Sequence, residues 1–475
     1  MDARIEPFVP PHPEPRTELP SMLEVVRTAL RNPLELWGVP SYTKPHILTR
    51  FLNERTLIAN DPGLIRHVLV DNAKNYRMAT IRQLILRPIL RDGLLTAEGD
   101  VWKRSRKAMA PVFTPRHING FAASMLSTSE AFCARYAGDG ETHEISQDMT
   151  ELTYEILAET LFSGEVAGAT EDFAGDVNRL LDTMGRIDPL DLIKAPQWVP
   201  RPFRLRGYRV LEKFRQLVRD TIDQRRAKIQ QAPDAVPEDF LTLLLLAEGG
   251  SEGLGGLSPQ EIEDNIITFI GAGHETTARA LGWALFCLAN APNEREIVEA
   301  EIDALLSGKR VPPPQDWLSL LPKTRAVFEE AMRLYPPAPS INRAAIEEDR
   351  YGDVVIPKGI TVLVMPWTLH RHRALWDEPD AFIPSRFWPE NRDTIDRFQY
   401  LPFGAGPRIC IGANFALQEA VIALGVLLHR FRFDMAEGAN DPWPVQKLTT
   451  QPEGGIHMTV TRRRHNNKKS SLSPA

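Results

Sequence analysis

The stretch Phe403–Gly412, FGAGPRICIG, decides the fold class of this 475-residue chain. It places three glycines and one proline around a single cysteine, Cys410. Glycine can take a positive φ and lets the backbone approach a neighbouring group, and proline stiffens the turn. After the cysteine, Phe415, Val421 and Leu424 support a helix that packs on one face. The sulfur is therefore expected at a helix N-terminus, where backbone N–H groups favour the thiolate over the thiol.

Three chemical roles are conceivable for a cysteine in this setting. A thiolate can be a nucleophile, but a nucleophile needs a nearby base and no motif supplies one. It can bind iron, because haem iron accepts a single cysteine thiolate as its axial ligand. The side chain can also be inert and buried, which is the usual role of a lone cysteine. The loop by itself leaves the last two roles open.

Composition narrows the class of protein. The net charge is −6, from 56 basic and 62 acidic residues, which gives no electrostatic case for binding nucleic acid. Cys133, Cys287 and Cys410 form no CxxC pair, so neither a disulfide framework nor a zinc site is indicated and a reducing compartment fits. The longest apolar run, Ala280–Ala289, is about half of the ~20 residues that a membrane span needs. We therefore expect a cytoplasmic protein with no transmembrane anchor.

Helix patterns dominate the chain, and the extended segments are short. The latter lie around Leu57, Val354, Val362 and Val460, with glycine and proline at their turns. Strands towards both ends and helices between them do not make a βαβ alternation, so the fold class is mainly α with a small β lobe. A proline-bearing apolar segment, residues 186–203, is expected either to be a lid or to cover a satellite core.

One long helix is predicted over residues 259–290. Ser258 is a good N-cap and Glu261 completes a capping box, while Asn290 and Pro292 mark the end. The helix would be about 31 residues, roughly 45 Å, long. Both of its halves are apolar nearly all round, so it is expected to be buried.

The middle of this helix departs from the local rules. Gly271 and Gly273 each cost about 1 kcal/mol against alanine in a helix. Glu275, Thr276 and Thr277 then place a carboxyl and two hydroxyls in a buried element, where unpartnered polar groups are costly. Departures that cluster in this way often mark a functional site. The structural alternative is a tight helix crossing at the glycines, with threonines that bond back to the backbone.

Taken together, these features resemble the cytochrome P450 family of haem-thiolate monooxygenases. The resemblance runs from about Leu57 to the last strands and rests on four motifs in a characteristic order. The motifs are the cysteine loop FGAGPRICIG, AGHETT at Ala272–Thr277 (the oxygen-binding groove), EAMR at Glu330–Arg333 (the ExxR motif), and PSRF at Pro384–Phe387 (the arginine motif). In the last of these, Ser385 stands where glutamate is common, but Arg386 is retained.

The resemblance implies a cytochrome P450 fold, a single large domain with a long central helix over the haem. The implied domain covers residues 21–461, between a proline-rich segment 1–20 and a basic tail 462–475, which is expected to be solvated or to contact an anion or a partner. It also implies haem b with Cys410 as the axial iron ligand. Glu275 and Thr276 would be an acid–alcohol pair that delivers protons. Glu330 and Arg333 share a helix face at i, i+3 and, with Arg386, would form a structural ion-pair network.

Further contacts follow from the same resemblance. The residues expected to bind the haem propionates have cationic or indole side chains and are Trp102, Arg106, Arg343 and Arg408. The other expected haem contacts are Phe403, Gly404, Gly412 and Ala272. The residues expected to face the substrate are apolar and are Leu95, Ala272, Ala338, Ile341 and Ile456. An apolar lining favours a lipophilic substrate.

The resemblance therefore implies insertion of one atom of dioxygen into a lipophilic substrate, by hydroxylation or epoxidation. The mapping leaves no room for a flavin or iron–sulfur domain. Electrons from NAD(P)H would therefore arrive through a ferredoxin or a flavodoxin-like donor with its reductase. Two alternatives keep the haem: a peroxide-driven peroxygenase, expected to lack the Glu275–Thr276 pair, and a non-catalytic haem ligand sensor. A dinucleotide-dependent enzyme without haem is a third, and it leaves the cysteine loop unexplained.

Overall fold

The computed structural model describes residues 6–51, 54–166, 204–249, 256–308 and 310–464, with isolated positions between 167 and 203. Most of the segment 186–203 and the tail beyond residue 464 lie outside the described residues. The helices are α1 (Met22–Arg31), α2 (Pro62–Arg66), α3 (Thr80–Leu90), α4 (Gly99–Met109), α5 (Pro115–Phe132), α6 (Ile145–Phe162), α9 (Leu205–Gln231), α10 (Phe240–Leu246), α11 (Pro259–Asn290), α12 (Pro292–Leu306), α13 (Trp317–Leu320), α14 (Pro322–Leu334), α15 (Pro366–Leu369) and α16 (Ala413–Arg430).

The strands are short and gather into small sheets. They are β1 (His46–Phe51), β2 (Glu54–Ala59), β3 (Tyr76–Met78), β4 (Glu141–Glu144), β5 (Ile341–Ala345), β6 (Asp349–Tyr351), β7 (Val354–Ile356), β8 (Thr361–Val364), β9 (Phe431–Met435), β10 (Trp443–Gln446), β11 (Thr450–Glu453) and β12 (His457–Arg462). The larger sheet has the order β1-β2-β8-β5-β3, in which only β2 and β8 pair in parallel among its neighbours. The antiparallel two-stranded sheet β10–β11 and the antiparallel three-stranded sheet β4–β12–β9 are separate from it.

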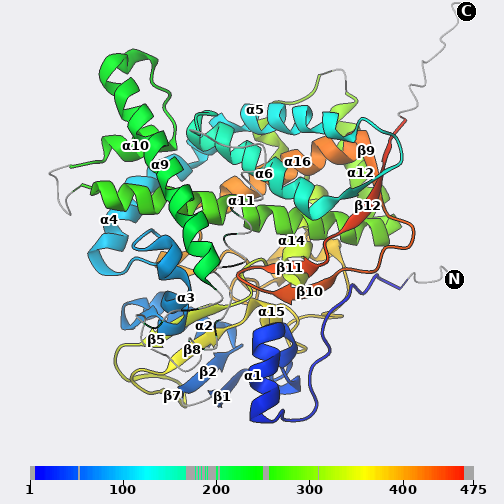
Figure 1. Cartoon of the computed structure of the whole chain (residues 1–475). Coiled ribbons are helices and arrows are strands. Elements are labelled where there is room, and N and C mark those ends of the chain that lie inside the picture. Colours follow the sequence, from blue (N-terminus) through cyan, green and yellow to red (C-terminus); the bar gives the residue numbers. More distant parts are fainter. Residues whose placement is uncertain are drawn as a thin grey trace, which may run out of the picture.

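The central helix α11 organises the molecule and confirms the capping prediction. The Ser258 side chain accepts from the Glu261 N–H, and the Glu261 carboxylate accepts from the Ser258 N–H at 2.8 Å. The helix ends at Asn290. Figure 1 shows α11 crossing the molecule between α5, α6 and α16 on one side and the larger sheet on the other. Its apolar side chains belong to the main hydrophobic core, which explains why a helix this long is almost wholly buried.

The mainly α fold with a small β lobe is confirmed. All four extended segments expected from the sequence are strands, since Leu57, Val354, Val362 and Val460 lie in β2, β7, β8 and β12. Other strands, such as β3 and β10, were not expected, because they are three or four residues long and carry arginine or proline instead of an apolar alternation.

The ends of the described chain lie on the helical body. In the proline-rich N-terminal segment, Phe8 contacts Phe286 of α11 with ring centroids 5.9 Å apart, and the Pro11 carbonyl accepts from the Tyr335 hydroxyl.

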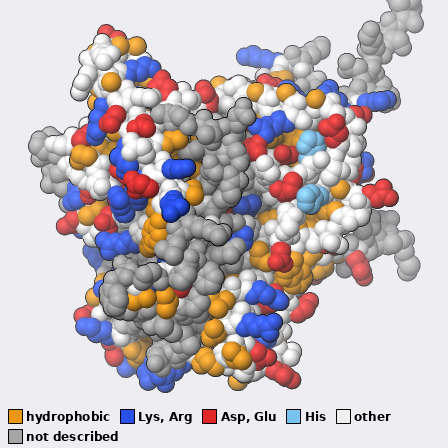
Figure 2. Space-filling model, in the orientation of Figure 1, with side chains coloured by type: hydrophobic (Ala, Val, Ile, Leu, Met, Phe, Trp, Pro, Cys, Tyr) orange, Lys and Arg blue, Asp and Glu red, His pale blue; other side chains and the backbone are white. Residues whose placement is uncertain are grey.

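Across the face in Figure 2, acidic and basic side chains are interspersed. No helix in the described part of the chain combines the length and the apolar character that crossing a membrane requires.

Candidate functional site

The cysteine loop has the tight geometry that its glycines predict. Gly404 and Gly406 have φ of 69° and 73°, in the left-handed region. A Cβ on Gly406 would lie 1.8 Å from the Leu69 carbonyl oxygen, so this position has no space for a side chain. The Cys410 N–H donates to the Phe403 carbonyl at 2.9 Å and closes the loop. The cysteine is therefore held by backbone geometry on a rigid turn.

The Cys410 thiol is exposed, yet its surroundings desolvate it. Burial raises the pKa of the Cys410 thiol, while the Gly412 N–H and the charge of Arg106 act to lower it. The expectation that this setting favours the thiolate is wrong for the free side chain, because α16 begins only at Ala413 and desolvation outweighs the helix terminus. A bound metal cation would displace the proton.

The middle of α11 opens on one face. Ala272 is exposed and Thr276 is half-buried, although the helix around them is buried. The helix is continuous here, so Gly271 and Gly273 do not interrupt it. A Cβ on Gly273 would lie 2.3 Å from Leu157 Cδ1, so this glycine permits a close crossing with α6. The opening comes from the small side chain of Ala272.

Thr276 bonds back to its own helix. Its hydroxyl donates to the Ala272 carbonyl at 2.9 Å, as the structural alternative predicts. The proton of the hydroxyl is thereby committed to the backbone. The hydroxyl oxygen can still accept a hydrogen bond on the open face of the helix.

Glu275 lies on a different side of α11. Its side chain is 3% exposed, and its Oε1 accepts from the Thr449 hydroxyl at 2.7 Å. Arg279 Nη2 is 3.8 Å from the same oxygen. Thr449 lies in the turn between β10 and β11 and was not identified from the sequence, because the contact joins positions 174 residues apart.

The expected ion-pair network lies buried at the end of α14. Both carboxylate oxygens of Glu330 accept from Arg333, at 2.6 and 2.7 Å, and both side chains are 0% exposed. Arg386 Nε lies 3.5 Å from Glu330 Oε1. Arg333 also donates to the carbonyls of His370, Pro379 and Ala381. The charges are thus paired and well hydrogen-bonded, as a buried pair requires.

Cationic side chains gather beside the cysteine loop. The Arg408 guanidinium lies 4.9 Å from the Trp102 ring centroid and donates to Glu98 at 2.6 Å. Burial, together with the charges of Arg408 and Arg82, lowers the pKa of Arg343 to about 10, while the carboxylate of Glu98 acts to raise it. Three guanidinium groups thus face one carboxylate.

Arg82, Arg343 and Arg408 carry three positive charges, and Glu98 supplies one negative charge. Within this group, two positive charges are therefore unmatched. A ligand with two carboxylates would supply the missing charge, and arginine forks suit carboxylates. Arg82 was not identified from the sequence, since nothing local distinguishes it from a solvated arginine on α3. Arg106 lies nearer the cysteine, where it donates to the Ile409 carbonyl at 3.0 Å.

The expected substrate-facing residues divide into two groups. Leu95, Ala272, Ala338 and Ile341 are all at least partly exposed. Ile341 also approaches the cysteine loop, since its Cδ1 would lie 3.8 Å from a Cβ on Gly404. Ile456 is 1% exposed and lies 3.6 Å from a Cβ placed on Gly282, in the other half of α11. The structure does not bring Ile456 to the open face at Ala272.

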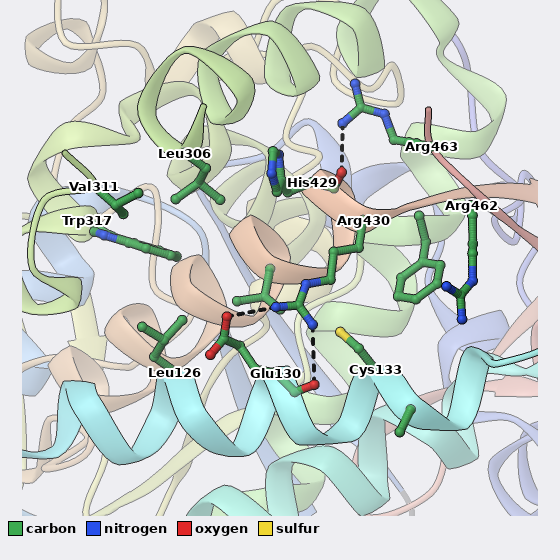
Figure 3. A pocket seen from close by; sticks show the side chains of 13 residues that line it. Leu126, Glu130, Cys133, Leu306, Val311, Trp317, His429, Arg430, Arg462 and Arg463 are labelled. Carbon is green, nitrogen blue, oxygen red and sulfur yellow. Dashed lines mark hydrogen bonds and ion pairs between the residues drawn. The ribbon is translucent and has the colours of Figure 1, made fainter. Parts of the chain in front are cut away.

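A separate open hollow of about 690 Å³ lies where α5, α16 and β9 meet the chain around Trp317 (Figure 3). Two of its arginines are paired: Arg430 donates to Glu130 on the lining, and Arg463 donates to the neighbouring Asp303, each at 2.7 Å. No site residue expected from the sequence lines this hollow.

Comparisons with known proteins agree with this geometry. A family model described as Cytochrome P450 matches residues 10–459. Cyclooctatin synthase of Streptomyces melanosporofaciens is 34% identical, over 82% of this chain and 83% of its own. Putative cytochrome P450 132 of Mycobacterium tuberculosis is 31% identical, over 88% and 90%.

Solved structures resemble the fold as a whole. The crystal structure of a cytochrome P450 (CYP102L1) superimposes with a TM-score of 0.78 at 26% identity, covering 96% of this chain and 100% of that one. The heme domain of cytochrome P450DA gives the same TM-score at 24% identity, with 96% and 98% covered, and supports the fold alone.

Proposed function

The chain belongs to the cytochrome P450 family of haem-dependent monooxygenases, and on that premise we propose that Cys410 ligates the iron of haem b. The chain is accordingly an oxidoreductase whose electrons come from NAD(P)H through redox partners. The observation that carries the assignment is the exposed but desolvated Cys410 beside three guanidinium groups and one carboxylate. A thiolate would satisfy the iron, and the cations would satisfy two propionates.

The residues present fit the haem. Arg82, Arg343 and Arg408 would bind its propionates, Trp102 would pack along its edge beside Arg408, and the exposed Ala272 would face it from α11. Phe403, Gly404 and Gly412 would contact it from the cysteine loop. When bound, the haem supplies the activation of dioxygen, and the protein positions and tunes it.

The protein's own groups on α11 would manage protons. The Thr276 oxygen, whose proton is committed to Ala272, would accept a hydrogen bond on the open face. Glu275 would exchange protons with that face through water. Because its carboxylate is held by Thr449 in this structure, delivery requires the carboxylate to turn or a water to bridge the gap.

We further propose a lipophilic substrate, hydroxylated or epoxidised, and a separate ferredoxin or flavodoxin-like donor in the cytoplasm. The partly exposed apolar residues Leu95, Ala338 and Ile341 support the substrate class. Ile456 would act at most from behind the lining, since it packs against α11 at Gly282.

The experiment is a spectral-shift screen of lipophilic compounds on the haem-loaded protein, followed by turnover of the hits under ¹⁸O₂. Turnover with NAD(P)H and surrogate redox partners should place one labelled atom in the product. Product formed only with added peroxide would identify a peroxygenase, and ligand binding without turnover under either condition would identify a sensor. Either result would overturn the monooxygenase proposal.

A further inference from the structure

The turn between β10 and β11 reaches the helix at the proposed proton-delivery acid. Thr449, at the end of this turn, is 5% exposed and donates its hydroxyl proton to Glu275 Oε1 at 2.7 Å. The Lys447 N–H donates to the Thr449 carbonyl at 3.0 Å and keeps the turn tight. The contact is therefore short, buried and made by a constrained backbone.

Both sides of the hairpin are anchored to other elements. Thr450 donates its hydroxyl to the Pro336 carbonyl at 2.7 Å and its N–H to the Pro337 carbonyl at 3.0 Å, just beyond α14. Asn32 bonds the other side, since its Nδ2 donates to the Pro444 carbonyl at 3.0 Å. Because the hairpin is fixed at both sides, Thr449 has little freedom to follow a moving carboxylate.

The open face and the buried flank of α11 are thus separated. Thr276 and Ala272 share the open face, whereas Glu275 is held at the hairpin. Arg279 stands 3.8 Å from the carboxylate, beyond hydrogen-bonding distance, so Thr449 makes the closer of the two contacts.

We propose that Thr449 is a positioning residue for Glu275: its hydroxyl holds the carboxylate on the buried flank of α11, from which Glu275 exchanges protons with the Thr276 face. This inference rests on the proposed function for its role in turnover, but the contact itself can be tested independently. A hydrogen bond to a carboxylate favours the charged form, so its loss raises the carboxyl pKa.

The surrounding titratable and charged groups bear on this assignment. Arg279 and His274 lie on α11 with Glu275, Tyr154 of α6 packs against His274, Glu419 of α16 bonds the neighbouring Thr277, and Lys447 lies in the hairpin turn with Thr449. Burial lowers the pKa of His274 to about 4, so this imidazole is neutral at neutral pH, and burial raises the pKa of Glu419. Arg279 is a charged group in contact with Glu275, and the variants below leave it in place.

The test is an infrared titration of the haem-loaded protein. Glu275→Gln identifies the carboxyl band of Glu275, and Thr449→Val removes the hydroxyl at nearly constant shape. The Glu275 titration midpoint should rise by about one to two pH units, the equivalent of one hydrogen bond to a charged group. Thr449→Ser should restore it, and the pH profile of product formed per NAD(P)H should move in the same direction.

Thr450→Val is the matched control, because it removes a neighbouring hydroxyl that bonds Pro336 instead of Glu275. It should leave the Glu275 midpoint where it is. An unchanged midpoint in Thr449→Val, or an equal shift in Thr450→Val, would overturn the inference. If the midpoint moves as expected while Glu275→Gln leaves coupling unchanged, Thr449 still positions Glu275 but the proton-delivery role in the proposed function fails.

Discussion

Arg333→Ala should damage this protein far more than the loss of a neighbouring ion pair. Arg333 makes two hydrogen bonds to Glu330 and three to backbone carbonyls, and its side chain is 0% exposed. Its removal leaves the buried Glu330 carboxylate with the Ile383 N–H at 2.8 Å and with Arg386 Nε at 3.5 Å. Breaking a buried pair in this way costs about 3–5 kcal/mol.

The same helix offers a matched control. Glu329 pairs with Arg392 at 2.6 Å, but the Arg392 side chain is 38% exposed and Glu329 also has Arg325 at 3.2 Å. Arg392→Ala should therefore cost no more than about 1 kcal/mol. The assay compares haem occupancy and the unfolding midpoint of the two variants after purification under identical conditions. Equal midpoints and equal haem occupancy in the two variants would refute the argument that Arg333 is structurally indispensable.

Three further outcomes follow from named contacts. Thr276→Ala should leave haem and substrate binding intact but divert NAD(P)H electrons to peroxide, and Thr276→Ser should retain more product per NAD(P)H; unchanged coupling would remove Thr276 from proton delivery. Gly406→Ala should abolish haem loading, because its Cβ would lie 1.8 Å from the Leu69 oxygen. The Cβ of Gly404→Ala would have nothing nearer than 3.8 Å, so this variant should cost only the ~1–2 kcal/mol of a left-handed backbone. Comparable haem occupancy in the two variants would contradict this. Burial, with a neighbouring arginine, lowers the pKa of His370 to about 3. Its neutral form therefore stabilises the fold fully above pH ~6.5, and that stability is lost as the pH falls towards 3. A His370→Asn variant whose stability falls with pH as steeply as that of the parent across this range would count against it.

Features set by local sequence were predictable. The ends of α11 follow from a capping box and a terminal asparagine, and the positive φ of Gly404 follows from a glycine in a tight turn. The Glu330–Arg333 contact follows from their i, i+3 spacing. Each of these depends on residues within a few positions of one another, which a single sequence displays.

Features set by distant contacts were not predictable. Thr449 meets Glu275 across 174 residues, and Arg82 joins Arg343 through a cluster assembled from α3 and β5. No periodicity or motif distinguishes such residues from ordinary surface threonines and arginines. Ile456 shows the converse: an apolar side chain was expected at the substrate, and the structure packs it into the core at Gly282.

The corrected expectations share one cause: the tertiary environment outweighs a local rule at these positions. The helix after Cys410 does favour a thiolate, but desolvation by the surrounding fold raises the thiol pKa instead. Gly271 and Gly273 do weaken a helix, yet packing keeps α11 continuous, with Gly273 against Leu157 of α6.

The central claim is that Cys410 ligates the haem iron. The most direct measurement is the absorption spectrum of the reduced, carbon-monoxide-bound protein, recorded for the parent chain, for Cys410→Ala and for Cys133→Ala. Cys133 is buried and donates to the Ser129 carbonyl, so its variant controls for the loss of a thiol elsewhere. The parent and Cys133→Ala should show the red-shifted Soret band of thiolate-ligated haem, and Cys410→Ala should lose it. Survival of that band in Cys410→Ala would contradict the account.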